Sequence, residues 1–427
     1  MAAIEPLRAL RFNPAQAPDL TAVTAPPYDV IDAALQAELL AEPHSITHLD
    51  FNAGSTDLND SDNRYRRAAT KLGAWRDAGV LQRDSSPALY VYEQAYEWAG
   101  EQLSRFGFIC RVRLEPFGQQ IHPHEQTFSG PKQDRFNLTV ETRCNLSQVL
   151  GIYPDPDREV TAPLAETRRR RPDMLATGYD GSANRIWIET DPAVIQTVCR
   201  AMADRPLYIA DGHHRYETAL RYKAWLQEME QLDADHPAHY TTFACVGSGD
   251  PGLRVMPTHR VLHGLRGFDV GLLRRQLTAT FEWREADVDP HDGAALDAWI
   301  AAQPASSLGL LTDTQVALLV PRSPDVLAAA LPDASPTLRQ LNVSLLHQGV
   351  LPTGVEPVFG HAQIQYVHLA TEAVEAVAHG APLAFLLRAT PVETVIEVAG
   401  RHELMPQKST YFYPKVLTGL VLYPLRD

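Results

Sequence analysis

The sequence predicts an α+β protein with a mixed-sheet N-terminal domain and a second α/β domain. Its 427 residues are enough for two or three domains of about 150 residues each. Hydrophobic residues make up 45% of the chain, so large cores can form and extensive disorder is not expected. Runs of aromatic and β-branched residues, typical of strands, alternate with segments whose apolar residues have helical spacing.

Charge and cysteine content restrict the class of protein. A formal net charge of −14 argues against nucleic acid as a partner, because binding to its phosphates needs a surplus of Lys and Arg. The four cysteines lie far apart without a C-x-x-C pair, so we expect reduced thiols. The N-terminus lacks the apolar stretch of a signal peptide, and no window approaches the roughly eighteen apolar residues of a membrane span. We therefore expect a cytoplasmic protein without a membrane partner.

The first domain, residues 1–235, begins with helices and a hairpin. Two segments, near 32–42 and 61–79, have the apolar spacing of helices. Residues 88–98 and 104–117 are rich in aromatic and β-branched side chains, and we expect them to pair as strands across a turn at Ala99-Gly100.

A strand–helix–strand–turn–helix order follows in the same domain. We expect a strand at 183–190, a helix at 191–202, a strand at 206–210 and a helix at 213–230. This order places the turn 211–215 at the carboxyl end of a strand, directly before a helix.

The second domain, residues 236–427, starts after a polar break. Its expected strands lie at residues 241–247, 253–262, 306–313, 315–321, 384–390 and 416–425. Residues 247–252 match G-x-G-x-x-G, but a dinucleotide site needs a helix at that point, whereas Pro251 and the residues after it favour a hairpin.

The turn Asp211-Gly212-His213-His214-Arg215 is the main candidate site. The first amides of a helix have no intrahelical partner, and the helix dipole makes that end positive, so a phosphate binds there well. Gly212 permits close approach of the backbone, and Arg215 can add a bidentate pair to phosphate oxygens. Asp211 can accept a proton or hold a metal ion, and at most one of the two histidines faces the ligand. The plainer alternative is an ordinary helix start with a surface ion pair.

The segment HPHEQTFSGPKQDR is a second candidate, which we expect to be a loop. In an extended chain His122 and His124 point to one side, as metal ligands or phosphate contacts require. Gly130 beside Lys132 and Arg135 suits the lining of a phosphate pocket. The alternative is a polar surface loop.

Three weaker candidates lie elsewhere. Lys408 in MPQKSTYFYPK can reach a phosphate, although the glycines of a P-loop are missing and a solvated lysine in a core segment is the alternative. Asp29 and the residues 258–260 are candidates for the same cleft, with buried hydrogen-bonding roles as the alternative.

Five motifs give the chain a family resemblance. PPYDVI, PHEQTFSGPKQDR, ADGHHRYETA, MPTHR and MPQKSTYFYPK together resemble the bacterial and archaeal family known as domain of unknown function 1015, over nearly the whole chain. The DGHHR turn is also similar to turns of the ParB/sulfiredoxin-like superfamily, which includes DNA-partition nucleotide switches, sulfiredoxins and free-serine kinases. That second resemblance implies a nucleotide-binding turn, with the phosphate on Gly212, His213, His214 and Arg215.

Departures from that superfamily narrow the expected function. A sulfiredoxin needs a cysteine close to its turn, and none lies near His213 in the sequence. A partition switch carries a basic DNA-binding module, whereas this chain is acidic. We therefore expect a nucleotide-dependent small-molecule kinase or phosphotransferase, acting on free serine or a related hydroxylated metabolite.

The expected site has two sets of residues. The catalytic candidates, as base or as Mg²⁺ ligands, are Asp211, His213 and Glu125. The candidates for binding ATP or ADP are Gly212, His213, His214, Arg215, His124, Lys132, Arg135 and Lys408.

Two alternatives to a kinase remain open. One is a non-catalytic, ParB-like nucleotide-binding regulator, and the other is a metal-dependent hydrolase that uses His122, His124, His213 and His214. The partners that we expect are a nucleotide and a small-molecule substrate, and the sequence leaves a homodimer open.

Overall fold

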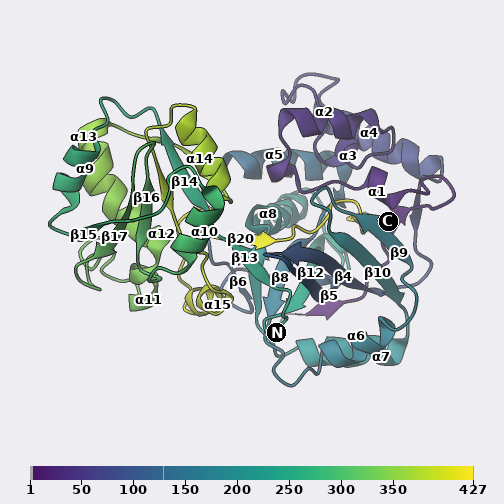
Figure 1. Cartoon of the computed structure of the whole chain (residues 1–427). Helices are drawn as coiled ribbons and strands as arrows, with labels where there is room; N and C mark the ends of the chain where they lie inside the picture. Colours follow the sequence, from purple (N-terminus) through teal and green to yellow (C-terminus); the bar gives the residue numbers. More distant parts are fainter. Residues whose placement is uncertain (1–2, 128, 427) are drawn as a thin grey trace. The chain divides into compact units, whose positions relative to one another are not determined.

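The computed structural model describes residues 3–127 and 129–426, and the chain divides into two compact units (Figure 1). The first unit contains the chain up to Pro123, the segment Thr127–Arg254 and the tail from Pro414. The second unit contains His124–Gln126 and Val255–Tyr413. In the described residues, no helix is both long and apolar enough to cross a bilayer.

The first unit is built on a nine-stranded mixed sheet, as the predicted fold class requires. The strand order is β6-β11-β8-β12-β5-β4-β10-β9, and β1 pairs with β5. The strands are β1 Ile4–Glu5, β4 Leu89–Trp98, β5 Glu101–Arg113, β6 Ile121–His122, β8 Val149–Tyr153, β9 Met174–Thr177, β10 Ala183–Glu189, β11 Leu207–Asp211 and β12 Tyr240–Gly247. β8 is parallel to β12 and antiparallel to β11.

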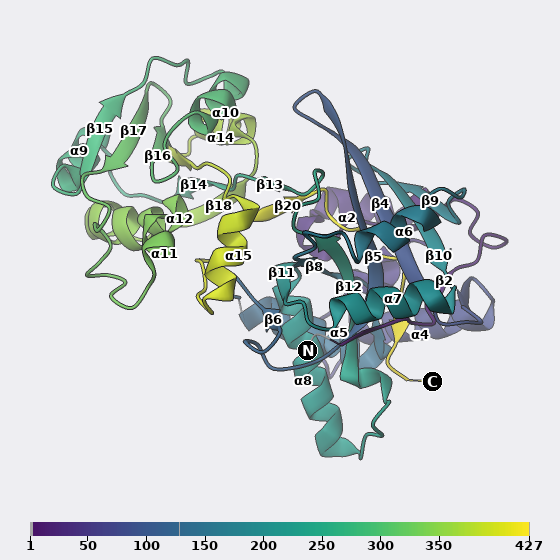
Figure 2. The same cartoon turned by 90° about the horizontal axis from the view of Figure 1, so that it is seen from below.

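Helices cover both faces of this sheet (Figures 1 and 2). They are α1 Leu20–Val23, η1 Tyr28–Val30, α2 Ala33–Ala41, α3 Thr47–Asp50, α4 Arg64–Asp77, α5 Ser129–Thr142, α6 Thr161–Thr167, α7 Pro192–Met202, α8 His213–Met229 and η2 Pro237–His239. Apolar residues of α6, α7 and α8 share one core with the sheet. A second core lies among α1–α5 and the short strand pair β2 Leu10–Phe12 and β3 Leu81–Arg83.

The predicted hairpin and the two predicted early helices are confirmed in this unit. β4 and β5 form the expected hairpin, and both of its turn residues, Ala99 and Gly100, have positive φ angles, 49° and 81°. That backbone matches the right-handed twist of the two strands. The two early helices are also present, as α2 and α4, each capped by the side chain that precedes it, Asp32 or Asn63.

The second unit has a six-stranded sheet in which every pair is antiparallel. Its order is β15-β17-β16-β19-β14-β18. The strands are β14 His259–His263, β15 Phe281–Glu285, β16 Leu308–Leu311, β17 Val316–Pro321, β18 Gln363–Val367 and β19 Leu383–Leu386. The helices are α9 Val270–Leu277, α10 Gly293–Ala301, α11 Pro336–Gln340, α12 Asn342–Ser344, the π-helix η3 Leu345–Val355, α13 Glu356–Phe359, α14 Ala370–Ala378 and α15 Val392–Gly400.

The observed boundaries between the two units differ from the single boundary predicted at residue 235. β12 lies in the middle of the first sheet, between β8 and β5, so the first unit continues to Arg254. The chain also leaves the first unit for three residues, His124–Gln126, and returns to it at Pro414. These exchanges depend on pairing between distant segments, which a local pattern does not encode.

Three local predictions are wrong. Lys132 and Arg135 lie on α5 and not on a loop, because a helix begins at Ser129. The segment 247–252 does not form a hairpin between its flanking strands, since β13 (Arg254–Met256) pairs with β20 (Tyr411–Tyr413). In the apolar tail only β21 (Tyr423–Pro424) is a strand, and it pairs with β7 (Cys144–Asn145).

Candidate functional site

The predicted strand–turn–helix is present at Asp211–Arg215. β11 ends at Asp211, and α8 starts at His213. Gly212 has φ 91° and ψ 26°, in the left-handed region, and its carbonyl accepts the first helical bond from the Tyr216 amide at 3.0 Å. A Cβ on this residue would lie 2.9 Å from Nε of Arg215. Both the backbone angle and the neighbouring side chain therefore favour glycine here.

One carboxylate and two cations meet at this turn. Arg215 donates from Nη2 to Oδ2 of Asp211 and from Nη1 to the carbonyl of Gln148. Lys415 donates from Nζ to Oδ1 of the same aspartate. The side chains of Arg215, Asp211 and Lys415 are only 13%, 18% and 6% exposed. Asp211 therefore lies between two cations, in the way that a phosphate oxygen would.

Lys415 is held in place by a buried pair on the two long strands of the hairpin. Arg105 of β5 donates to Oε1 of Gln94 and to the carbonyl of Pro414. Gln94 of β4 in turn donates to the carbonyl of Lys415 at 2.9 Å. Burial lowers the pKa of Arg105, and the charge of Asp211 is among those that oppose this. Sequence reasoning missed both residues, because each looks like an ordinary strand position.

Arg215 and Arg135 line one small cavity, with Asp50, Thr218 and Ser147 among its other residues. Its volume is about 40 Å³. The hydroxyl of Thr218 is buried and has no hydrogen-bond partner among the residues that the structure describes. An anion that pairs with Arg215 here would compete with its present partners, Asp211 and the carbonyl of Gln148.

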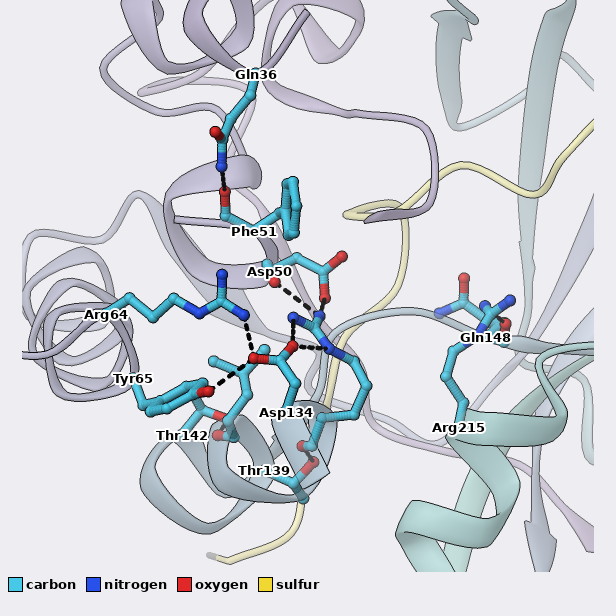
Figure 3. Close-up of polar contacts among 12 residues, drawn as sticks. Gln36, Asp50, Phe51, Arg64, Tyr65, Asp134, Thr139, Thr142, Gln148 and Arg215 are labelled. Atoms are coloured by element: carbon cyan, nitrogen blue, oxygen red, sulfur yellow. Dashed lines mark hydrogen bonds and ion pairs between the residues drawn. The ribbon is translucent and has the colours of Figure 1, made fainter. Parts of the chain in front are cut away.

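Arg135 lies in a closed cluster of charges with Asp50 and Asp134, two residues that Figure 3 labels. It is 5% exposed, and Nη1 donates to the carbonyl and to Oδ1 of Asp50 at 2.8 and 3.1 Å. Its Nε and Nη2 donate to Oδ2 of Asp134 at 2.9 and 2.6 Å. Arg64 and the Tyr65 hydroxyl bind the other oxygen of Asp134. The guanidinium that we expected to bind phosphate is thus engaged by two carboxylates of the protein.

Burial and ion pairing have opposite effects on the pKa values of the two carboxyl groups in this cluster. Burial raises the pKa of Asp50, while the charges of Arg135 and Arg215 act in the opposite direction. The pKa of Asp134 is lowered, because Arg135, Tyr65 and Arg64 together outweigh its burial. The cluster holds α3, α4 and α5 together.

Lys132 borders a larger cavity between α5 and α8. Its Nζ donates to Thr127 Oγ1 at 3.0 Å and pairs with Glu217 Oε2 at 2.9 Å. The cavity has a volume of about 650 Å³ and is also lined by Gly130 and Arg221. The predicted association of Gly130 with Lys132 is therefore found, but Arg135 borders a different cavity.

Three predicted residues belong to the second unit, where they stabilise a turn. The carboxylate of Glu125 accepts hydrogen bonds from the amides of Lys408 and Ser409 at 2.9 and 3.1 Å. Burial raises the pKa of this carboxyl group, and the two amides oppose the shift. His124 is fully buried and contacts Thr410 Oγ1 at 2.8 Å. Lys408 has a φ of 55°, which the bonds from its amide support.

The four predicted histidines are buried or half-buried. His213 is buried in the first turn of α8, and His214 beside it is half-buried. His122 is buried in β6, with its ring 5.3 Å from that of Tyr208. Across residues 3–127 and 129–426, no group of three or more His, Cys, Asp or Glu side chains is placed to hold a metal ion.

The weaker candidates belong to different units. Asp29 lies in η1 of the first unit. In the second unit His259 and Arg260 are in β14 and almost fully buried. Arg260 donates to the carbonyl of Lys408 at 2.8 Å, and burial lowers the pKa of this guanidinium to about 10. These two residues therefore have the structural role that was the alternative to a site.

Comparisons with known proteins give one family and several remote structures. A conserved hypothetical protein from Pyrococcus furiosus is 14% identical with a TM-score of 0.35, covering 74% of this chain and 95% of that one. A free serine kinase in complex with AMP is 15% identical at 0.35, covering 73% and 92%. SbnI with a C-terminal truncation from Staphylococcus aureus is 10% identical at 0.36, covering 74% and 87%.

TM-scores this low carry no argument about fold or chemistry. The search of curated proteins gave no match. The family model described as "Protein of unknown function (DUF1015)" matches residues 4–344.

Proposed function

We propose that this chain, which belongs to the DUF1015 family, is a nucleotide-dependent small-molecule kinase or phosphotransferase. Its acceptor would be free serine or a related hydroxylated metabolite. The observation that carries the proposal is the left-handed turn at Gly212, where Arg215 and Lys415 both bind Asp211 at the start of a seventeen-residue helix.

The turn offers a phosphate group two kinds of contact. The first amides of α8 and the helix dipole favour an anion at this end of the helix. Arg215 and Lys415 add two cations whose present partner is the carboxylate of Asp211. A donor phosphate would compete with Asp211 for them, so phosphate binding would release the aspartate.

The released carboxylate has two roles open to it. Phosphoryl transfer asks a protein mainly to position the reactants and to stabilise charge. Bound ATP or ADP with Mg²⁺ would supply the phosphoryl group. Asp211 would then accept the proton of the acceptor hydroxyl or help to hold the cation. His213, in the first turn of α8, and Glu125, in the second unit, are the other candidates for the base.

Phosphorus NMR tests the activity. The full chain is incubated with Mg²⁺, with ATP, ADP or CTP, and with a pool of hydroxy amino acids and sugars, and we expect a new phosphoester signal. Nucleotide-dependent thermal stabilisation without a new phosphoester would favour the regulator instead. If there is neither stabilisation nor turnover, the proposal is wrong.

Arg215→Ala locates the activity. Loss of hydrogen bonds to a charged group costs about 1.5–3 kcal/mol, so we expect nucleotide affinity to fall about tenfold or more. Arg200→Ala, which removes an exposed arginine from the last turn of α7, is the matched control and should bind as the parent does. Equal nucleotide affinity of the two variants would contradict the assignment of the turn.

A further inference from the structure

The glycine-rich segment Gly247–Pro251 borders a cavity of the first unit with a volume of about 780 Å³. Small-molecule sites commonly occupy about 300–1,000 Å³. Its apolar wall contains Leu103, Phe106, Pro156, Ala165 and Pro251, and its charged residues are Asp155, Arg158, Arg168 and Asp250. The proposed phosphotransferase makes no use of this cavity.

The cavity lies where two parallel strands end. β8 and β12 run in parallel with Tyr153 opposite Gly247, and both residues are the last of their strands. β11 runs antiparallel to β8, so Asp211 pairs with Leu150 near the other end of β8. In sheets with parallel strands, ligands bind outside the carboxyl ends of those strands. The cavity is therefore at the opposite end of the sheet from the Asp211–Arg215 turn.

The two carboxylates at the cavity already have partners in the protein. Asp155 accepts from the amides of Val160 and Thr161 at 3.2 and 2.9 Å. Asp250 accepts from the amides of Phe106 and Gly252 at 3.2 and 2.9 Å. Backbone amides therefore take up much of their negative charge.

The two arginines carry the positive charge of the cavity. Arg168 pairs with Glu93 at 3.0 Å, but Glu93 also pairs with Arg185 at 3.2 Å, so one carboxylate serves two guanidinium groups. The Arg168 guanidinium lies 4.9 Å from the ring centre of Phe106, at the apolar wall. Arg158 is exposed and lines the same cavity. The guanidinium groups of Arg158 and Arg168 therefore lie next to the apolar wall of the cavity.

We propose that this cavity binds an organic anion in which a carboxylate or phosphate group is joined to an apolar group. Arg158 and Arg168 pair with the anionic group, and the wall around Phe106 and Pro251 contacts the apolar group. Guanidinium groups pair strongly with both kinds of anion. This site is separate from the proposed phosphotransferase site and does not depend on it.

Three small probes test the ligand class. Benzoate, phenyl phosphate and benzyl alcohol share one ring, and their binding to the full chain is measured by saturation-transfer NMR titration. We expect benzoate, phenyl phosphate or both to bind about tenfold more tightly than the neutral alcohol. Comparison of the two anions shows which group the cavity prefers. If neither anion binds more tightly than the alcohol, the proposal is overturned.

Variants show where the anion binds, because phenyl phosphate can also reach the Asp211–Arg215 turn. Gly249 lines the cavity, and a Cβ at this position would meet no atom within 4 Å among the described residues, so we expect Gly249→Leu to occupy part of the cavity. Gly73→Leu on α4 has the same open surroundings and is the matched control.

We expect Gly249→Leu and Arg158→Gln each to weaken anion binding about tenfold, and Gly73→Leu to leave it unchanged. Circular dichroism checks that each variant is folded. If Gly249→Leu does not fold, Arg158→Gln decides the question. Unchanged affinity in the folded variants would overturn the proposal.

Discussion

Arg135 and Arg215 are both basic residues near a glycine, and the sequence suggests the same phosphate-binding role for each, yet their surroundings differ. Arg135 is engaged by Asp50 and Asp134, which lie on two helices, and it is 5% exposed. Arg215 is held by an aspartate four residues before it and by one carbonyl group. Figure 3 shows Asp50, Asp134 and Arg64 close together and Arg215 beside Gln148, apart from them.

The difference separates a structural arginine from one that can exchange its partner. If Arg135 moved, Asp50 would remain buried with its charge unpaired. If Arg215 moved, Asp211 would keep Lys415. An arginine can bind an incoming anion only when its present partner tolerates the loss, so we assign the ligand to Arg215 and the fold to Arg135.

The largest expected effect is on stability. Removing one partner of a buried ion pair costs about 3–5 kcal/mol, so Arg135→Ala should lower the free energy of unfolding by that amount. Arg215→Ala should lower it by about 1 kcal/mol, since Asp211 keeps a cation. Guanidinium unfolding curves, with Arg200→Ala as control, measure both. If the two variants lose similar amounts of unfolding free energy, Arg135 and Arg215 do not differ in their structural role.

The loss in Arg135→Ala should also depend on pH. Burial raises the pKa of Asp50 and Arg135 opposes it, so without the arginine this pKa rises further. The folded variant then binds the proton more tightly than the unfolded chain does, and its stability recovers as pH falls through the new pKa, by about 1.4 kcal/mol per unit of additional shift.

Asp134 acts in the same direction. Its lowered pKa stabilises the parent above the ordinary aspartate range, and part of that stabilisation comes from Arg135. That part is lost only as pH falls through the ordinary aspartate range. Between pH 5 and pH 8 the effect of Asp50 remains, so the difference between Arg135→Ala and the parent should be smaller at pH 5 than at pH 8. Adding Asp50→Asn to the variant should remove most of the pH dependence, and an equal difference at both pH values would contradict the argument.

Gly212, at the turn itself, should have a smaller effect than Arg135. Gly212→Ala places a side chain at φ 91°, which should cost about 1–2 kcal/mol of stability. It should also weaken nucleotide binding, since the new Cβ displaces Arg215. Gly249→Ala is the control, because its surroundings are open. A Gly212→Ala variant as stable as the parent would show that the turn does not need glycine.

Sequence reasoning succeeded where a structure depends on neighbouring residues. The hairpin at Ala99-Gly100 and the strand–turn–helix at Gly212 follow from turn residues and apolar spacing within about 20 residues. It failed at the second candidate segment, where we expected a loop and a helix starts at Ser129.

The members of the candidate site divide in the same way. Asp211 and Arg215 are four residues apart, and their pairing is compatible with a helix start in the sequence. Lys415 is 204 residues from Asp211, and its motif drew attention to Lys408 instead. The sequence contains the residues Glu125 and Arg135 but no sign that one caps a turn of the second unit and the other closes an ion cluster.

The sequence by itself determined the family, the α+β class and the glycine turn at the head of α8, because motifs, periodicity and turn chemistry are properties of short segments. Only the tertiary structure decided that Lys415 joins Asp211, that Arg135 is enclosed by carboxylates, and that Gly247–Pro251 borders a cavity. Each of these features depends on strand pairing and burial between segments that are distant in the sequence. The free energy that stabilises such contacts comes from the folded chain as a whole, and a short segment does not encode it.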